Sequence, residues 1–229
     1  MNSSLEGILL IDKPKDKSSF YLVKRLRHFT KVKKIGHAGT LDPFATGLMI
    51  LLIGKNYTKQ SDLFLHHDKT YETVLHLGFT TESYDKETPI FIFSEKIPSL
   101  EEVKEVIESF QGEQYQTPPM FSAKKINGTP LYELARKGQT IERKPCKVNI
   151  NINLLDYNYP FLKLSVTCSK GTYIRSLGND LGLKLGCGAY LTELRRIRSG
   201  NFQIEQSLSL SDIENNPELI EKYLIQDPV

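Results

Sequence analysis

The segment GHAGTLDPFATG, residues 36–47, gathers three glycines around one carboxylate, Asp42. Glycine permits backbone conformations closed to other residues and lets a large ligand approach the main chain. Pro43 restricts the preceding Asp42 to an extended backbone, so the carboxylate is presented from a fixed position. The apolar run 48–53 follows directly and predicts a buried strand. We therefore expect a shaped polar loop that leads into the core of the fold.

Asp42 has two interpretations. An anchored aspartate in a dry cleft serves as a nucleophile or a base if a neighbouring cation keeps it ionised. An Asp-Pro pair also occurs where the aspartate merely caps a turn, and that is the commoner case for an arbitrary sequence. The residues of this one loop leave both open.

Length and composition are those of a folded protein without a membrane segment. The chain has 229 residues, of which 39% are hydrophobic and 25% charged, which excludes collagen, coiled coil and disordered classes. Its longest apolar run, residues 48–53, is far below the roughly 18 residues that span a bilayer. The first residues lack the pattern of a secretory leader, so we expect a cytoplasmic location. The three cysteines, Cys146, Cys168 and Cys187, have no zinc-site spacing, and we expect no metal.

Charge is segregated along the chain. Residues 13–34, 124–147 and 163–198 carry net charges of +8, +5 and +5, whereas residues 82–113 carry −6. Such clustering is typical of a protein that lays one face on a polyanion, although solvated basic helices would give the same pattern. The glycines near residues 47–55 and 182–188 match neither a P-loop nor a dinucleotide-binding motif, so we expect no nucleotide cofactor.

Hydrophobic periodicity predicts an α+β fold, because adjacent strands mix with single helices without regular alternation. A capping box formed by Ser99 and Glu102 begins the clearest helix. Residues 116–128 lack periodicity and are predicted to be a long functional loop. Strands are predicted at residues 7–11, 48–53, 71–77, 90–93, 148–155 and 161–167, and helices at 20–29, 131–137, 173–185 and after Ser99.

Residues 36–47 closely resemble the catalytic motif of the TruB family of tRNA pseudouridine synthases. Other segments resemble motifs of this family in the same order, over roughly residues 7–215. They are GILLIDKP at 7–14, KTY at 69–71, PPMFSAK at 118–124 with LYELARKG at 131–138, CSKGTYIR at 168–175 and LRR at 194–196.

The resemblance implies the pseudouridine synthase fold, with a mixed, mostly antiparallel sheet, flanking helices and an RNA-binding cleft. It implies one catalytic domain over residues 1–229, with an RNA-clamping insertion at about 116–145. Members of the family commonly continue into a C-terminal PUA domain, and we expect this chain to be a short form without it. Glu82 and Thr88 stand where the family usually has Asp and Gly, which puts the geometry of that loop in question.

The activity implied by the resemblance is isomerisation of uridine to pseudouridine at position 55, in the T-arm loop of tRNA, without a cofactor. Asp42 is implied as the catalytic carboxylate, Tyr71 as the ring against the target base and Arg175 as the cation beside Asp42. From the residues alone, the commoner interpretation is an ordinary strand aromatic for Tyr71 and a surface ion pair for Arg175.

The resemblance also implies a set of RNA contacts. His37 would enter the space left by the flipped base, or alternatively cap loop backbone groups. The remaining cations would contact phosphates or support the structure, and the sequence does not separate these two roles. They are Lys13, Lys124, Arg136, Arg195 and Arg196.

Two other functions stay open, a non-catalytic tRNA-binding or tRNA-folding module and an enzyme for a different, including a guide-dependent, RNA. The non-catalytic module is disfavoured because the chain has the catalytic residues of the motif, Asp42, Tyr71 and Arg175. Product formation on a bare T-arm hairpin would distinguish a tRNA enzyme from an enzyme for a different RNA. A hydrolytic glycosidase is disfavoured because we identify no second catalytic carboxylate. We expect a monomer with tRNA as partner, without a membrane or an obligate protein partner.

Overall fold

The computed structural model describes residues 5–126 and 128–226, and their contacts divide the chain into two compact units. Unit 1 contains the residues up to Tyr71 and those from Leu194 onward, and unit 2 contains Glu72–Glu193. Strands β4 and β12 each contribute residues to both units. The prediction of a single catalytic domain is not tested by this division and stays a prediction.

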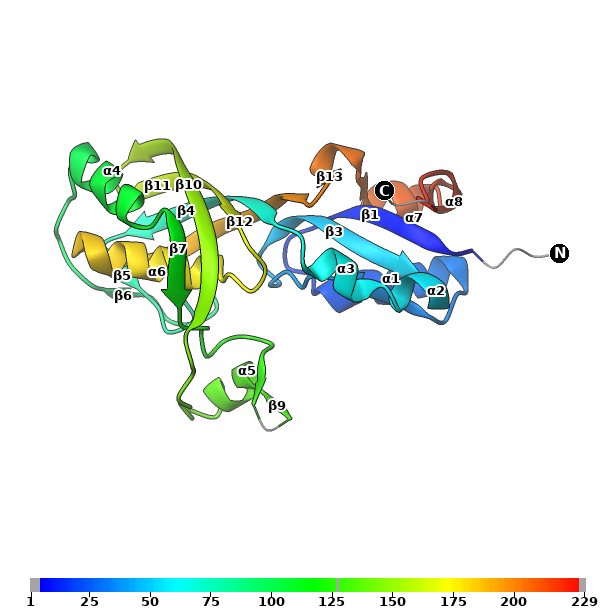
Figure 1. The fold of residues 1–229 in the computed structure, drawn as a ribbon, viewed down its shortest axis with the longest axis horizontal. Coiled ribbons are helices and arrows are strands. Elements are labelled where there is room, and N and C mark those ends of the chain that lie inside the picture. Colours follow the sequence, from blue (N-terminus) through cyan, green and yellow to red (C-terminus); the bar gives the residue numbers. More distant parts are fainter. Residues whose placement is uncertain (1–4, 127, 227–229) are drawn as a thin grey trace. The chain divides into compact units, whose positions relative to one another are not determined.

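Unit 1 is built on a mixed group of strands (Figure 1). Strand β3 pairs antiparallel with β1 and β2 and parallel with β12, while β14 pairs parallel with β1. The elements of unit 1 are β1 (Gly7–Lys13), α1 (Ser19–Thr30), β2 (Ile35–Ala38), β3 (Thr46–Ile53), α2 (Lys55–Thr58), α3 (Ser61–Leu65), the start of β4 (Lys69–Leu77), the end of β12 (Ala189–Ser199), β13 (Phe202–Gln203), the 3-10 helix η1 (Ile204–Gln206), β14 (Leu208–Ser209), α7 (Leu210–Asn215) and α8 (Leu219–Lys222).

The core of unit 1 forms around β3, in which Leu48–Ile53 are buried without interruption. A strand that is covered on both faces has such a continuous apolar run instead of alternation. One face packs in a cluster with Ile8, Leu10 and, from α3, Phe64. The side chain of Ser18 accepts a hydrogen bond from the Tyr21 N–H and caps α1, which begins at Ser19, one residue before the start that the sequence predicts.

In unit 2 the central pairing partner is β10, which pairs antiparallel with β7 and β11. Strand β10 alternates buried Val148, Ile150 and Ile152 with exposed residues, and it contacts α4, which in turn contacts α6. The elements of unit 2 are β5 (Phe79–Thr80), β6 (Phe91–Ile92), α4 (Leu100–Ser109), β7 (Gly112–Gln116), β8 (Lys125–Ile126), β9 (Thr129–Pro130), α5 (Leu131–Ala135), β10 (Cys146–Asn158), β11 (Phe161–Cys168) and α6 (Ile174–Leu185), together with the remainders of β4 and β12.

These elements confirm the α+β prediction and correct it locally. Both hydrogen bonds of the predicted Ser99–Glu102 capping box are present at the start of α4. Strands β2, β7 and β12 are absent from the sequence prediction. In β2, Gly36 and His37 have weak strand propensity, and β12 carries four charged side chains. These two strands therefore lack the apolar alternation that predicts a strand.

The segment between β7 and β10 projects away from the strands of unit 2 (Figure 1). We call residues 117–145 the insertion. It contains the short hairpin of β8 and β9, followed by α5. It covers most of the long loop predicted at residues 116–128, although β8 lies within that range. The predicted role of the insertion in clamping RNA stays a prediction. No helix of the described residues is long and apolar enough to cross a membrane.

Packing of α6 against the start of β12 generates a stability prediction. A methyl group on Gly182 would lie 2.3 Å from the Ala189 main-chain nitrogen, whereas one on Gly178 would meet only side-chain ends of Leu191 and Leu75. Gly-to-Ala normally stabilises a helix interior by about 1 kcal/mol. We expect Gly182→Ala to destabilise instead, by about 1–3 kcal/mol, since backbone yields less than side-chain ends.

Urea unfolding of Gly182→Ala and Gly178→Ala measures this effect, with Gly178→Ala as the milder matched substitution. A Gly182→Ala protein as stable as the wild type would contradict the close packing.

Candidate active site and RNA-binding residues

Asp42 lies in the loop between β2 and β3, and the start of α1 anchors this loop. The Ser19 hydroxyl is buried and hydrogen-bonds both main-chain groups of Leu41, donating to the oxygen at 3.0 Å and accepting from the nitrogen at 2.9 Å. A turn follows, in which the Ala45 N–H donates to the Asp42 carbonyl at 3.1 Å. The main chain on both sides of Asp42 is therefore fixed.

Lys13, the last residue of β1, is fully buried beneath the same loop. Its ammonium donates to the carbonyls of Pro14 at 3.0 Å, Lys17 at 2.6 Å and Pro43 at 3.0 Å. Burial lowers the pKa of Lys13 to about 8, while the negative charges of Asp42 and Asp16 act in the opposite direction. At neutral pH a positive charge is thus held close to Asp42.

Arg196, a residue of β12, contacts the main chain before and after the Asp42 turn. Its buried guanidinium donates to the carbonyls of Leu48 at 2.7 Å and Gly39 at 3.2 Å. Strands β12 and β3 meet at Arg196 and Gly47, where a Cβ atom on Gly47 would lie 2.3 Å from the Arg196 carbonyl oxygen. Gly47 also has a φ of 106°, so the close strand contact and the backbone conformation both require glycine there.

The burial of Lys13 and Arg196 bears on the two roles that the sequence leaves open for these cations, a phosphate contact or support of the structure. A phosphate would have to break the carbonyl network to reach either group, and a buried cation without its partners is strongly unfavourable. The bonds of Lys13 and Arg196 therefore agree with the structural role, in which both residues support the Asp42 loop. Their predicted contact with RNA stays a prediction.

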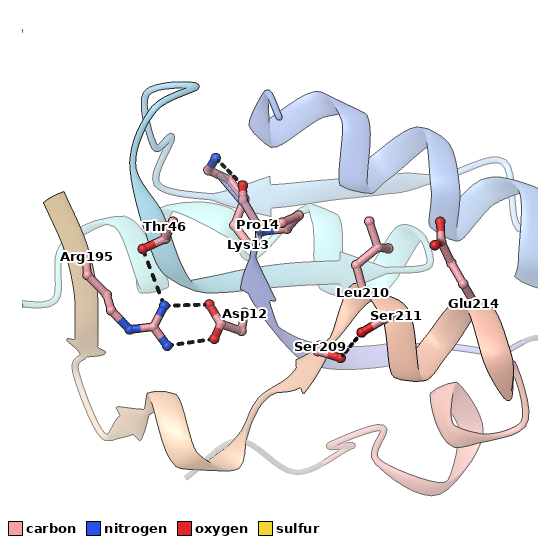
Figure 2. A pocket seen from close by; sticks show the side chains of 9 residues that line it. All are labelled: Asp12, Lys13, Pro14, Thr46, Arg195, Ser209, Leu210, Ser211 and Glu214. Carbon is pink, nitrogen blue, oxygen red and sulfur yellow. Dashed lines mark hydrogen bonds and ion pairs between the residues drawn. The ribbon is translucent and has the colours of Figure 1, made fainter. Parts of the chain in front are cut away.

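Arg195 points away from Arg196, as neighbours on a strand do, and its side chain is 40% exposed. The guanidinium forms two hydrogen bonds with the Asp12 carboxylate, at 3.0 and 2.6 Å, and approaches the Thr46 hydroxyl (Figure 2). A pocket of about 380 Å³ opens beside this pair. Its lining residues are Asp12, Lys13, Pro14, Thr46, Arg195, Ser209, Leu210, Ser211 and Glu214.

Tyr71 and His37 are the aromatic residues predicted for the site, and both belong to unit 1. Tyr71 is buried on β4. His37 is half-buried on β2, opposite Leu51 of β3, and its Nδ1 atom is buried without a hydrogen-bond partner among the described residues. Burial, together with the charge of Arg196, lowers the pKa of His37 below its usual value. A neutral ring follows at neutral pH.

Arg175 lies in unit 2, in the first turn of α6, and is 3% exposed. Its guanidinium donates to the carbonyls of Ser83 at 2.9 Å and Phe121 at 2.7 Å, and its Nε atom lies 3.4 Å from an oxygen of the buried Asp85 carboxylate. Arg175 therefore forms a buried ion pair with Asp85 and not an ion pair at the surface, which is the alternative interpretation from the sequence. The predicted pairing of Arg175 with Asp42 stays a prediction.

Asp85 is a site residue that the sequence analysis does not identify. Its carboxylate accepts hydrogen bonds from the Ser83 hydroxyl at 2.6 Å and the Glu87 N–H at 2.8 Å. The Thr88 hydroxyl accepts from the Ser83 N–H at 3.0 Å, so the loop with the unusual Glu82 and Thr88 is closed by its own hydrogen bonds. A loop aspartate flanked by polar residues carries no pattern in a single sequence that would mark it as buried.

The remaining predicted RNA contacts, Lys124 and Arg136, are exposed side chains of the insertion. Arg136 lies 2.5 Å from the Glu87 carboxylate and 5.5 Å from the centre of the Tyr132 ring. The Lys124 ammonium lies 3.5 Å from the Cys146 sulfur. Both positions are accessible to an RNA backbone. Among the described residues, no group of three or more His, Cys, Asp or Glu side chains is arranged to hold a metal ion.

Comparison with known families divides the chain into two matched regions. Residues 27–174 match the family described as TruB family pseudouridylate synthase (N terminal domain), and residues 175–227 match the tRNA pseudouridylate synthase B C-terminal domain. A protein named tRNA pseudouridine synthase B from Protochlamydia amoebophila is 55% identical over 98% of this chain and 86% of its own. Its namesake from Chlamydia abortus is 57% identical over 89% of this chain and 86% of its own.

Solved structures agree with the predicted fold. The chain is similar to one described as a Cbf5-Nop10-Gar1 complex, with a TM-score of 0.73 and 26% identity over 95% of this chain and 59% of that one. It is also similar to an H/ACA RNP bound to a substrate RNA containing 2′-deoxyuridine, with a TM-score of 0.70 and 25% identity over 94% and 55% of the two chains. The predicted pseudouridine synthase fold is confirmed.

The two arginines of β12 predict a contrast in stability. Arg196→Met removes the guanidinium donor of the buried Leu48 carbonyl and the half-buried Gly39 carbonyl, and we expect the free energy of unfolding to fall by about 3 kcal/mol or more. Arg195→Met removes a partly exposed ion pair, for which we expect less than about 1 kcal/mol. Chemical denaturation of both variants measures the difference. Equal losses would contradict the support role of Arg196.

His37 predicts a pH dependence of stability. Its pKa is lowered in the folded protein, so the unfolded chain binds a proton first as the pH falls below 6.5. Stability is then lost at up to about 1.4 kcal/mol per pH unit. We expect the stability advantage of wild type over His37→Gln to shrink between pH 7 and pH 5. Urea unfolding at three pH values tests this, and a constant difference would refute it.

Proposed function

The chain belongs to the TruB family of pseudouridylate synthases, and on this premise we propose that it isomerises the uridine at position 55 in the T-arm loop of tRNA. In this reaction the C1′–N1 bond breaks, the uracil turns, and a C1′–C5 bond forms. The proton on C5 is lost and N1 gains one, so the reaction conserves all atoms and transfers no electrons to another molecule. It therefore requires no redox cofactor.

Asp42 is the catalytic carboxylate in this proposal. Positive charge develops on the sugar as the C1′–N1 bond breaks, and a carboxylate either stabilises or traps that charge, or removes a sugar proton. Each of these roles requires an ionised oxygen at a fixed position. The observation that carries the proposal is the fixation of the Asp42 loop, by the buried ammonium of Lys13, the guanidinium of Arg196 and the Ser19 hydroxyl.

The other predicted site residues act on the base and on the charge of Asp42. A uridine stacked in a folded loop must be flipped out, which costs a few kcal/mol. Stacking on Tyr71 offsets about 1–3 kcal/mol of this, and the neutral ring of His37 fills the vacated space. Arg175 supplies the positive charge that keeps Asp42 ionised, and its hydrogen bonds to Ser83 and Phe121 orient it.

Lys124, Arg136 and Arg195 contact the phosphate backbone of the T arm in this proposal. All three are accessible cations, in contrast to Lys13 and Arg196. Arg136 exchanges its exposed Glu87 partner for a phosphate, which is inexpensive because exposed ion pairs contribute little. The proposal has the chain act in the cytoplasm as a monomer, without an obligate protein partner. Activity of the purified chain alone tests the last point.

Pseudouridine formation by the purified protein on an unmodified tRNA transcript tests the proposal, with Asp42→Asn in parallel. We expect product at the T-loop uridine, and a loss of at least about 100-fold in Asp42→Asn, because the amide supplies no negative charge. Tight tRNA binding by that variant would show that it folds.

Three results would contradict the proposal. Product at another uridine would overturn the assigned position, and an active Asp42→Asn would overturn the catalytic carboxylate. Binding without product in the wild type would instead favour a tRNA-folding module. A bare T-arm hairpin that serves as substrate would exclude a guide-dependent enzyme.

A further inference from the structure

The insertion leaves unit 2 between the last residue of β7 and the first residue of β10. These residues, Gln116 and Cys146, are opposite each other in the antiparallel pairing of the two strands. The side chain of Gln116 is buried, and its amide is directed at the start of α6.

The Gln116 amide forms two hydrogen bonds with the main chain of Tyr173, the residue before α6. Its Nε2 atom donates to the Tyr173 carbonyl at 3.0 Å, and its Oε1 atom accepts from the Tyr173 N–H at 2.7 Å. No side chain of Tyr173 caps the helix. The amide therefore pairs with the N–H and the C=O of one residue, as a neighbouring strand would, and it fixes the point at which the chain enters the helix.

Two further bonds join the same segments. The Ser176 hydroxyl donates to the Thr117 carbonyl at 3.3 Å, and the Arg175 guanidinium donates to the Phe121 carbonyl at 2.7 Å. Gln116, Thr117 and Phe121 thus contact three of the four residues from Tyr173 to Ser176, at the start of α6. The segment thus contacts the end of the Arg175 side chain and the main chain two residues before it.

We propose that Gln116 is a positioning residue for Arg175, which couples the base of the insertion to the cation of the active site. The inference rests on the proposed function, in which Arg175 acts on the charge of Asp42. Gln116 itself touches neither the substrate nor the reacting atoms.

The orientation of the first turn of α6 determines where the Arg175 guanidinium lies. Arg175 follows Tyr173 by two residues and carries a long side chain, so a small tilt of the first turn of α6 displaces the guanidinium by a larger distance. A displacement of about 1 Å in a catalytic group lowers a rate by about 100-fold. Because the insertion begins directly after Gln116, an RNA held by the insertion acts on the segment that positions Arg175.

Gln111 provides a matched control. Its amide donates to the Ile152 carbonyl at 2.7 Å and accepts from the Ile152 N–H at 2.9 Å, which is the same two-bond arrangement on a main chain. Ile152 lies in β10, and no proposed catalytic group adjoins it in sequence. The loss of either amide removes the same number and kind of hydrogen bonds.

The experiment compares Gln116→Met with Gln111→Met, because methionine keeps the side-chain length without the amide. For each variant we would measure the single-turnover rate of pseudouridine formation on tRNA, the Kd for tRNA and the Tm. Gln116→Met should lower the rate roughly 10- to 100-fold, with the Kd within about 2-fold of wild type. Gln111→Met should lower the Tm to a similar extent and leave the rate within about 2-fold.

Two outcomes would overturn the inference alone, with the proposed function intact. In the first, Gln116→Met and Gln111→Met have equal rates while Arg175→Met is inactive. In the second, Gln116→Met weakens tRNA binding by the same factor as the rate, so that Gln116 holds the insertion for binding. A fully active Arg175→Met would instead overturn the proposed role of Arg175, and the positioning role with it.

Discussion

Two buried cations, Lys13 and Arg196, are the constraint on which the geometry of unit 1 depends. A desolvated ammonium or guanidinium is unfavourable unless hydrogen-bond acceptors surround it. Main-chain carbonyls of Pro43, Gly39 and Leu48 supply those acceptors. The same bonds that satisfy the cations therefore fix the loop around Asp42, so the loop cannot relax without leaving a charge unpaired in the core.

Unit 2 also contains a buried cation, Arg175, that is surrounded by main-chain carbonyls. The buried guanidinium of Arg175 collects carbonyls from Ser83 and Phe121, and the carboxylate of Asp85 balances its charge. The two carbonyls come from loops that are far apart in sequence, one of them in the insertion. In both units a buried cation binds main-chain carbonyls of loops instead of lying on the surface. The ammonium of Lys13 offers three donors for this, and each guanidinium offers five in a rigid fork. This distinguishes the supporting cations from Lys124, Arg136 and Arg195, which stay accessible.

Asp85 and Gln116 illustrate what a single sequence hides. Neither stands in an apolar pattern, and each becomes informative only through a partner that is distant in sequence, Arg175 for the first and Tyr173 for the second. Strand β12 is not predicted from the sequence for a related reason, because its charged side chains interrupt the apolar pattern expected of a buried strand. Contacts with residues that are distant in sequence, and not local propensity, determine the structure at these positions.

The sequence by itself determined the elements with strong local patterns, such as the apolar strand β3, the capped helix α4 and the loop with Asp42. It also determined the family, because motifs in a fixed order are a property of the chain alone. Only the tertiary structure decided which cations are buried. Lys13 and Arg196 cannot be told from Arg195 by residue type or spacing, since burial depends on the partners that folding brings to each side chain.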